Sequence, residues 1–299
     1  MIESTETAAV VALLRHGDRL WHHYADLIES AGSALSVLSG DFDDPAHAHA
    51  PPLFDPSAWS HDVDLDAVAA EIDTWRSEGI DVLTVLDERY PSNLRLIHNR
   101  PPLIFVRGRL TPDDDRSIAV VGTRQATQLG LEATADMAAT IAQAGYTVVS
   151  RLAEGIDTAA HEAALGVGGR TVAVIGTGLR RSYPSKNASL QKRLATEAAV
   201  VSQFWPDQPP TRTTFPMRNV VMSGLALATV VIEASGTSGA KMQARFALEH
   251  GRPVFLMSSL LEHRWARDYA ERPGTHVVDS ASEVLERVER LTTATALTL

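Results

Sequence analysis

Short apolar runs alternate with stretches of helical spacing along most of the chain. The apolar runs predict strands at 103–106, 117–122, 146–150, 171–175, 200–201, 228–233 and 253–257. Stretches with helical spacing lie at 131–144, 157–165, 190–198 and 240–249. Apolar strands separated by helices of about ten residues are typical of a parallel sheet covered on both faces. The pattern therefore predicts an α/β fold with a doubly wound, mostly parallel sheet.

The first 66 residues follow a different pattern. Within 1–40, apolar residues recur at spacings of three and four, which predicts helices. Residues 40–66 contain four prolines, seven aspartates and three histidines, a composition that favours an extended linker. We therefore expect a small acidic helical region with its linker at 1–66 and the α/β domain at 67–299. His47, His49 and His61 lack the ligand spacing of a metal site, so a solvated loop is the preferred interpretation and no metal is expected.

Composition excludes several classes of protein. The 299 residues include no cysteine, which rules out disulfides, thiolate zinc sites, iron–sulfur clusters and cysteine nucleophiles. No segment reaches the roughly 18 apolar residues that a membrane-spanning helix requires. The apolar run at 8–14 is flanked by Glu6 and Arg15 rather than by a basic region, unlike a signal peptide. We therefore expect a cytoplasmic protein with no membrane partner.

Charge is distributed unevenly along the chain. The formal net charge is −10, which taken alone argues against a nucleic-acid ligand. Residues 1–98 carry 18 acids and 5 bases, however, whereas residues 99–299 carry 19 acids and 22 bases. Of the 27 bases only three are lysines. Arginine suits bidentate binding of phosphate, although the same excess can reflect genomic base composition.

Three predicted strand ends carry glycine-rich turns. Gly122-Thr123-Arg124 follows one strand, Gly176-Thr177-Gly178 follows another, and 236–239 follows Glu233 and opens the helix near Lys241. In open α/β sheets, ligands bind beyond the carboxyl ends of the strands, where glycine allows close approach of the backbone and helix N-termini attract anions. Together the three turns predict a site for phosphate groups.

The turns do not fit the common nucleotide-binding motifs. The sequence contains no G-x-x-x-x-G-K-[ST], so a P-loop nucleotide triphosphatase is disfavoured. Neither Gly122 nor Gly176 begins a G-x-G-x-x-G motif with an acidic residue about twenty positions later, which disfavours a dinucleotide oxidoreductase.

Two further groups of side chains allow more than one interpretation. Asp157 and His161 are one helical turn apart and could share a metal, but an N-cap role for Asp157 and a partly buried structural role for His161 are preferred. Phe215, Arg218 and Asn219 precede a predicted helix. This trio can stack on a base and bind a phosphate, or Phe215 can be a core residue.

A series of short motifs occurs in a fixed order across roughly residues 75–260. The motifs are Tyr90-Pro91, Pro101-Pro102-Leu103, Val120 to Arg124, Ser150 to Asp157, Gly176 to Leu179, Tyr183-Pro184 with Asn187, Phe215 to Asn219, and Glu233-Ala234 with Ser238-Gly239. In this order they resemble the DprA/Smf family of DNA-processing proteins. The resemblance implies an extended Rossmann-type domain that binds single-stranded DNA without strong sequence preference. It further implies a homodimer that hands the strand to a RecA-type recombinase during transformation, with no catalytic turnover and no cofactor.

The resemblance also implies which residues face DNA. Arg124, Lys186, Asn187, Arg218 and Asn219 correspond to the anion-binding and DNA-facing motifs of the family, and the helix that starts at Gly239 closes the pocket. With the neighbouring turn residues, the candidate DNA- and phosphate-binding residues are Gly122, Thr123, Arg124, Lys186, Asn187, Arg218, Asn219, Ser238, Gly239 and Lys241.

Several positions depart from the family pattern. Arg151 stands where the family usually has glycine, Val220 where it has arginine, Gln203 where it has an acid, and Ser258 where a Pro-Gly pair begins. The change at 220 removes a phosphate contact for which Arg151 can substitute. The winged-helix domain of many members is not expected, since only 292–299 follow the helix predicted at 282–291.

Two other function classes stay open. The segment Glu233 to Gly239 has some likeness to the glycine-rich loops of Rossmann-like proteins that bind or hydrolyse nucleotides. A diverged interaction protein that keeps the fold but binds no DNA is the third interpretation. If the chain does bind DNA, we expect its acidic N-terminal region to compete with the strand.

Overall fold

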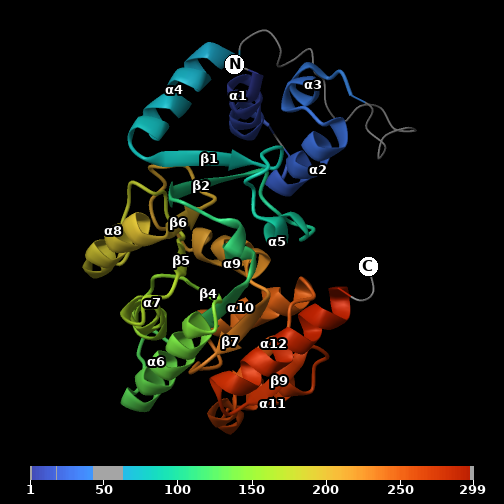
Figure 1. Ribbon diagram of the computed structural model, residues 1–299. Coiled ribbons are helices and arrows are strands. Elements are labelled where there is room, and N and C mark those ends of the chain that lie inside the picture. The colour runs from blue at the N-terminus through green and yellow to red at the C-terminus, as the bar shows by residue number, and fades with distance from the viewer. Residues whose placement is uncertain (1, 18, 43–62, 297–299) are drawn as a thin grey trace.

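The computed structural model of the protein describes residues 2–17, 19–42 and 63–296 (Figure 1). Within these residues the strands form one nine-stranded sheet in the order β1-β2-β6-β5-β4-β3-β7-β8-β9. Their bounds are β1 (Ile80–Thr84), β2 (Leu103–Gly108), β3 (Ser117–Val121), β4 (Thr147–Ser150), β5 (Thr171–Val174), β6 (Ala199–Ser202), β7 (Ala228–Val231), β8 (Val254–Met257) and β9 (Thr275–Val278).

The helices account for most of the remaining described residues. They are α1 (Ile2–His16), α2 (Trp21–Ala31), α3 (Ala34–Ser39), α4 (Leu65–Ser77), α5 (Ser92–Arg95), α6 (Gln128–Gln143), α7 (Ile156–Gly166), α8 (Ala188–Glu197), α9 (Thr214–Leu225), α10 (Gly239–Glu249), α11 (Arg264–Ala270) and α12 (Ala281–Ala296). None of the helices described has the length and apolar character needed to span a bilayer.

The order of the strands locates the natural ligand site of the sheet. From β3 the chain proceeds outward through β4, β5 and β6, then returns to the other side of β3 and proceeds through β7, β8 and β9. All of these neighbours pair in parallel, whereas β1 with β2 and β2 with β6 are antiparallel. The order therefore reverses between β3 and β7. In doubly wound sheets, ligands bind beyond the carboxyl ends of the strands at such a reversal.

Alternating residues of the central strands supply the two faces of the core. Ile118 and Val120 of β3 belong to one apolar cluster with residues of α6, α7 and α12, whereas Ala119 and Val121 belong to another with residues of α9 and α10. This is the two-residue period expected when both faces of a strand are buried. The N-terminal helices pack at the β1 edge, where α4 contacts both α1 and β1 (Figure 1).

The structure confirms the predicted α/β fold and its mostly parallel sheet. Every strand predicted from an apolar run is present, with ends that differ by a few residues. Strand β9 and helix α11 were not predicted, and the antiparallel β1–β2 edge adds to the doubly wound part. The division of the chain at residue 66 stays a prediction. His47, His49 and His61 lie outside the described residues.

Candidate nucleic-acid interface

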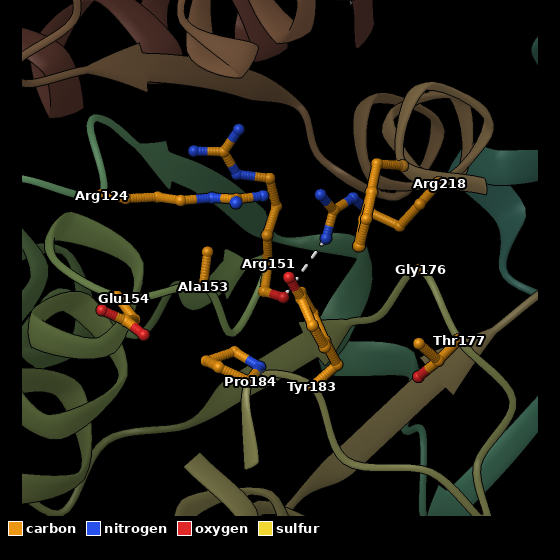
Figure 2. A pocket seen from close by; sticks show the side chains of 10 residues that line it. Arg124, Arg151, Ala153, Glu154, Gly176, Thr177, Tyr183, Pro184 and Arg218 are labelled. Atoms are coloured by element: carbon orange, nitrogen blue, oxygen red, sulfur yellow. Dashed lines mark hydrogen bonds between the residues drawn. The ribbon is translucent and has the colours of Figure 1, made fainter. Parts of the chain in front are cut away.

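Two adjoining cavities lie beyond the carboxyl ends of the central strands. The larger has a volume of about 510 Å³ and reaches from Gly122 to the start of α10; the smaller, of about 60 Å³, extends toward Tyr183. Arg124, Arg151 and Arg218 line both, and we call the combined space the arginine cleft. Its walls come from the loops that follow β3, β4, β5 and β7, from α9 and from the start of α10. Figure 2 shows the three arginine side chains extending toward one another.

Arg124 is the most accessible cation of the cleft. It is exposed and follows β3, and it forms no hydrogen bond or ion pair with any described residue. Its guanidinium carbon lies 5.8 Å from the centre of the Phe215 ring, within cation–π range. The charge of Arg124 is therefore available to an anion that enters the cleft.

Arg151 is buried and its charge is paired with that of Asp157, but one of its nitrogens is unused. Its Nε and Nη2 atoms each donate to the Asp157 carboxylate at 3.0 Å, and Nη2 also donates to the Gly122 carbonyl at 2.8 Å. Its Nη1 atom has no partner among the described residues. A Cβ placed on Gly239 would lie 3.1 Å from this Nη1 atom, so glycine leaves room between the arginine and the start of α10. One nitrogen of Arg151 is thus directed at the larger cavity.

Arg218 projects from α9 into the floor of the cleft. Its Nη1 donates to the carbonyls of Val174 at 3.0 Å and Arg151 at 3.2 Å, and its Nε donates to Oδ1 of Asn219 at 3.1 Å. Burial, reinforced by repulsion from Arg151, lowers the pKa of Arg218 to about 9. No carboxylate binds this guanidinium among the described residues. Burial of an unpaired cation is costly, so an anion bound here would stabilise it.

The N-terminus of α10 forms the opposite wall. Ser238 is the N-cap residue, and its hydroxyl accepts a hydrogen bond from the backbone N–H of Ala240 at 3.1 Å. Ser235, Thr237, Ser238 and Gly239 line the cavity. The first N–H groups of a helix and its dipole favour a bound anion. This wall therefore adds backbone donors to the three arginines.

Two aromatic rings flank the smaller cavity. Phe215 and Tyr183 have ring centres 5.6 Å apart with an angle of 39° between their planes. Tyr183 is 45% exposed. A Cβ on Gly176 would lie only 2.7 Å from Cδ1 of Phe215, so glycine is what lets this ring lie over the end of β5. Exposed aromatic faces beside cations are suited to stacking of nucleobases.

The structure brings seven of the ten candidate residues together. Gly122, Thr123, Arg124, Arg218, Asn219, Ser238 and Gly239 all line the arginine cleft. They come from three separate stretches of chain: Gly122 to Arg124 and Ser238-Gly239 belong to the turns expected to converge from their positions after strands, whereas Arg218 and Asn219 lie on α9.

The other three candidates do not line the cleft. The amide nitrogen of Asn187 donates to the Leu152 carbonyl at 3.0 Å and to the Thr158 hydroxyl at 2.9 Å, so this buried side chain holds the loop after β4. Lys186 forms an ion pair with Glu154. Lys241 lies 6.0 Å from the Tyr269 ring centre, on the side of α10 that faces α11. Asn187 and Lys241 are therefore engaged by other parts of the protein, and direct contact of Asn187, Lys186 or Lys241 with DNA stays a prediction.

Asn187 restrains an unusual piece of backbone. Leu152 has a φ of 65°, a left-handed conformation that is rare for leucine. It follows Arg151 directly, and its carbonyl accepts the Asn187 hydrogen bond. The loop after β4 is thus held in a strained shape that directs Arg151 across the cleft.

The Asp157 N-cap prediction was wrong. The N-cap residue of α7 is Gly155, whose φ of 76° and close approach to the Thr123 carbonyl, 2.5 Å from a placed Cβ, both require glycine. Asp157 instead lies in the first turn and binds Arg151. His161 is fully buried, more than predicted, and no group of three metal-binding side chains occurs among the described residues.

Sequence reasoning gave too small a role to Arg151 and none to Tyr183. From the sequence, Arg151 is only a substitute for the arginine missing at 220. In the structure it is central to the cleft, whereas Val220 does not line it. The signal available was a basic residue directly after a strand. Tyr183 was noted only as part of a motif, because pattern alone does not show that its ring faces Phe215.

The fold and cleft together define a Rossmann-type α/β protein with an arginine-lined cleft at the reversal of its sheet. The family profile "DNA recombination-mediator protein A" matches residues 81–292. The chain belongs to this family, as the motif series indicated. It is 36% identical over 213 residues to DNA processing protein DprA of Streptococcus pneumoniae, which covers 69% of this chain and 73% of that protein. Protein Smf of Synechocystis is 39% identical over 177 residues, covering 58% of this chain but only 44% of Smf.

Solved structures agree with this assignment. The crystal structure of DprA from Streptococcus pneumoniae matches with a TM-score of 0.74 and 29% identity, covering 94% of this chain and 97% of that one. DNA processing protein A from Helicobacter pylori shares the fold with a TM-score of 0.62 and 23% identity, covering 72% and 96% of the two chains. That structure concerns the single-stranded DNA binding mode of the Helicobacter pylori protein.

Proposed function

We propose that this protein binds single-stranded DNA in the arginine cleft, without sequence preference, and acts in DNA processing as a DprA-type binding protein rather than as an enzyme. The observation that carries the proposal is the meeting of Arg124, Arg151 and Arg218 from three separate elements, each with guanidinium nitrogens that no described residue engages. A polyanion is the ligand class that such a cleft favours.

The cleft separates the two chemical parts of a nucleotide. A phosphate fits between Arg124, Nη1 of Arg151 and the N-terminus of α10, where charge and N–H donors coincide. A base fits against Phe215 and Tyr183 at the smaller cavity. Every base has an aromatic face, and phosphates carry no sequence information, so binding of this kind is tolerant of sequence.

The carboxylates around the cleft favour binding over hydrolysis. Both oxygens of Asp157 bind Arg151, Glu154 pairs with Lys186, and the Glu233 carboxylate accepts hydrogen bonds at 3.0 Å from the backbone N–H and the hydroxyl of Thr127. A general base must be free to reach the attacking water. Glu233, the acid that the nucleotide-hydrolase interpretation relied on, instead holds the start of α6.

The family supports the wider part of the proposal. We place the chain in the cytoplasm as a homodimer that passes the bound strand to a RecA-type recombinase during uptake or recombination of DNA. This part of the proposal rests on the resemblance to the DprA/Smf family, to which the chain belongs. Co-purification with the host recombinase in the presence and absence of oligonucleotide tests this part separately.

The decisive experiment replaces Arg124. Arg124→Ala should weaken the binding of oligo-dT and of a mixed-sequence oligonucleotide to the same extent. It should also reduce the slope of log K against log salt by about 0.7, the value for one lost single-strand phosphate contact. Fluorescence anisotropy at several salt concentrations measures both.

Arg76→Ala serves as the matched control. Arg76 is a surface arginine of α4, paired with Asp73 at 3.4 Å, and should leave affinity and slope unchanged. Equal affinity and slope for Arg124→Ala and the unaltered protein would refute the proposed site. Tight binding of mononucleotides with release of product would favour the hydrolase instead.

A further inference from the structure

A second basic cavity, about 740 Å³ in volume, lies between α8 and the β1–β2 edge of the sheet. We call it the α8 groove. Its lining residues include Glu78, Arg107, Arg180, Gln191 and Lys192. None of the candidate residues derived from the sequence belongs to it. Its volume is within the range of cavities that hold a nucleotide-sized ligand.

The groove holds cations that no carboxylate neutralises. Arg107 donates from Nη1 to the Leu179 carbonyl at 3.2 Å, while its Nε is buried without a hydrogen-bond partner among the described residues. Lys192 is exposed and has no ion pair with a described residue. Glu78, the acid in the lining, is already bound by Arg180 through two hydrogen bonds of 2.7 Å. The groove therefore has an excess of positive charge.

Gln191 adds a buried polar atom to the same wall. The residue is 7% exposed, and its Nε2 donates to the Arg181 carbonyl at 2.9 Å, which fixes the orientation of the amide. Its Oε1 is consequently left without a partner. A buried acceptor of this kind is costly unless a donor reaches it. The groove thus combines unpaired donors with one unpaired acceptor, as a site for a phosphate and a nucleobase N–H would.

One loop connects the groove with the arginine cleft. The chain between β5 and α8 contributes Gly176, Thr177 and Tyr183 to the cleft, and Leu179, Arg180 and Ser182 to the groove. Tyr183 is exposed and directly follows Ser182 of the groove. A strand stacked on Tyr183 therefore has a direct course over this loop from one cavity to the other.

We infer that the α8 groove is a second phosphate-binding subsite, occupied by the same DNA strand after it leaves the arginine cleft over Tyr183. The inference rests on the proposed function and extends it. The protein covers a longer stretch of the DNA strand than the arginine cleft alone would, and Lys192 and Arg107 contact the part of the strand beyond the cleft.

Length dependence tests the inference. Affinities for dT6 and dT20 are measured by anisotropy for the unaltered protein, Lys192→Ala and Lys192→Glu. Lys192 lies on the surface of α8, so its replacement does not disturb the core. We expect the lysine variants to bind dT6 normally and dT20 about fivefold more weakly, and Lys192→Ala to lose about 0.7 of the salt slope for dT20 only. Arg193→Ala is the control, since Arg193 is the next residue and pairs with Glu197 at 2.8 Å.

The comparison between variants separates the groove from the effect of strand length. A longer strand offers more binding registers, which raises its apparent affinity without any new contact. The test is therefore the difference between variants in dT20 affinity, not the difference between dT6 and dT20. Unchanged dT20 binding by Lys192→Glu would overturn the inference while leaving the arginine cleft intact. Failure of the unaltered protein to bind either oligonucleotide would overturn the proposed function and the inference together. Inorganic phosphate should compete with dT20 less effectively in Lys192→Ala than in the unaltered protein. Equal competition in the two proteins would also count against the inference.

Discussion

Arg170 and Arg124 show why individual ligand-binding side chains are hard to predict from sequence. Arg170 precedes β5 and binds the Asp114 carboxylate through Nε at 2.6 Å and Nη2 at 2.7 Å. Arg124 follows β3 and has no such partner among the described residues. The acid that neutralises Arg170 is 56 residues away in sequence. A pattern can place an arginine at a strand end, but whether its charge is free depends on contacts that only the fold creates.

Asn187 illustrates the same limit for a residue within a motif. Its amide is used by Leu152 and Thr158, both distant in sequence, so the side chain supports the cleft without entering it. The residues that were predicted well are those whose role follows from the backbone. Gly122 and Gly239 line the cleft because they follow a strand or begin a helix, and both positions could be read from the pattern.

The hydrogen bonds of His161 determine its protonation. The Thr171 hydroxyl donates to the Val148 carbonyl at 2.8 Å, so it must accept from Nδ1 of His161, 2.7 Å away. The Nε2 atom is therefore unprotonated, and it is buried without a partner among the described residues. Burial lowers the pKa of His161 to about 4, because a proton on Nε2 would bring a charge into the core.

Because His161 is buried in its neutral form, we predict that the free energy of unfolding falls in acid. Since its pKa is near 6.5 in the unfolded chain and about 4 in the folded one, the unfolded state binds more protons between these values. The contribution is present above pH 6.5 and is lost as the pH falls toward 4. His161→Leu should therefore remove about 2 kcal/mol of the fall in unfolding free energy between pH 7 and pH 5. Urea unfolding of both proteins at the two pH values measures it, and parallel pH dependence would contradict it.

At the scale of elements, the strands and helices that could be predicted are those whose apolar residues follow one clear period. The strands β3 to β8 are short, apolar on both faces and bounded by glycine or charge, so their positions and parallel pairing followed from the sequence. Strand β9 was missed because only Val278 is buried and its other residues are half-buried. Its pairing with β8, and hence the width of the sheet, comes from tertiary contact rather than from local pattern.

The loop between β5 and α8 depends on close backbone packing. A Cβ on Gly178 would lie 2.1 Å from the Trp205 carbonyl oxygen and 2.2 Å from that of Pro206, neither of which can rotate away. Gly178→Ala should therefore destabilise the protein by about 3 kcal/mol. Gly166 ends α7 with nothing within 4 Å of its placed Cβ, so Gly166→Ala should instead stabilise it by about 0.5 kcal/mol. Thermal unfolding of the pair checks the contrast, and equal effects would contradict it.

At the scale of the whole molecule, the acidic N-terminal part shares one apolar core with the sheet. Residues Ala8 to Leu14 of α1 are buried, and the Arg15 guanidinium lies over the rings of Trp75 and Trp205 at 5.7 and 5.1 Å. Deleting residues 1–66 would expose this core. A change in DNA affinity after such a deletion would mix the loss of charge with the loss of packing. Whether the acidic charge repels DNA is therefore tested by substitutions that leave the helices in place.

Replacing aspartate by the isosteric asparagine in the full chain tests the charge effect. Changing Asp43, Asp44, Asp55 and Asp62 to asparagine removes four of the 18 acids in residues 1–98. Weaker repulsion of the strand should raise the association rate with oligo-dT by about twofold to fivefold at low salt. The difference should disappear near 1 M salt, where the Debye length falls to about 3 Å. Asp→Glu changes at the same four positions keep the charge and should leave the rate unaltered. Stopped-flow measurement at several salt concentrations separates the variants, and an equal rate for the asparagine variant and the unaltered protein at low salt would show that the arginine cleft attracts DNA independently of the acidic region.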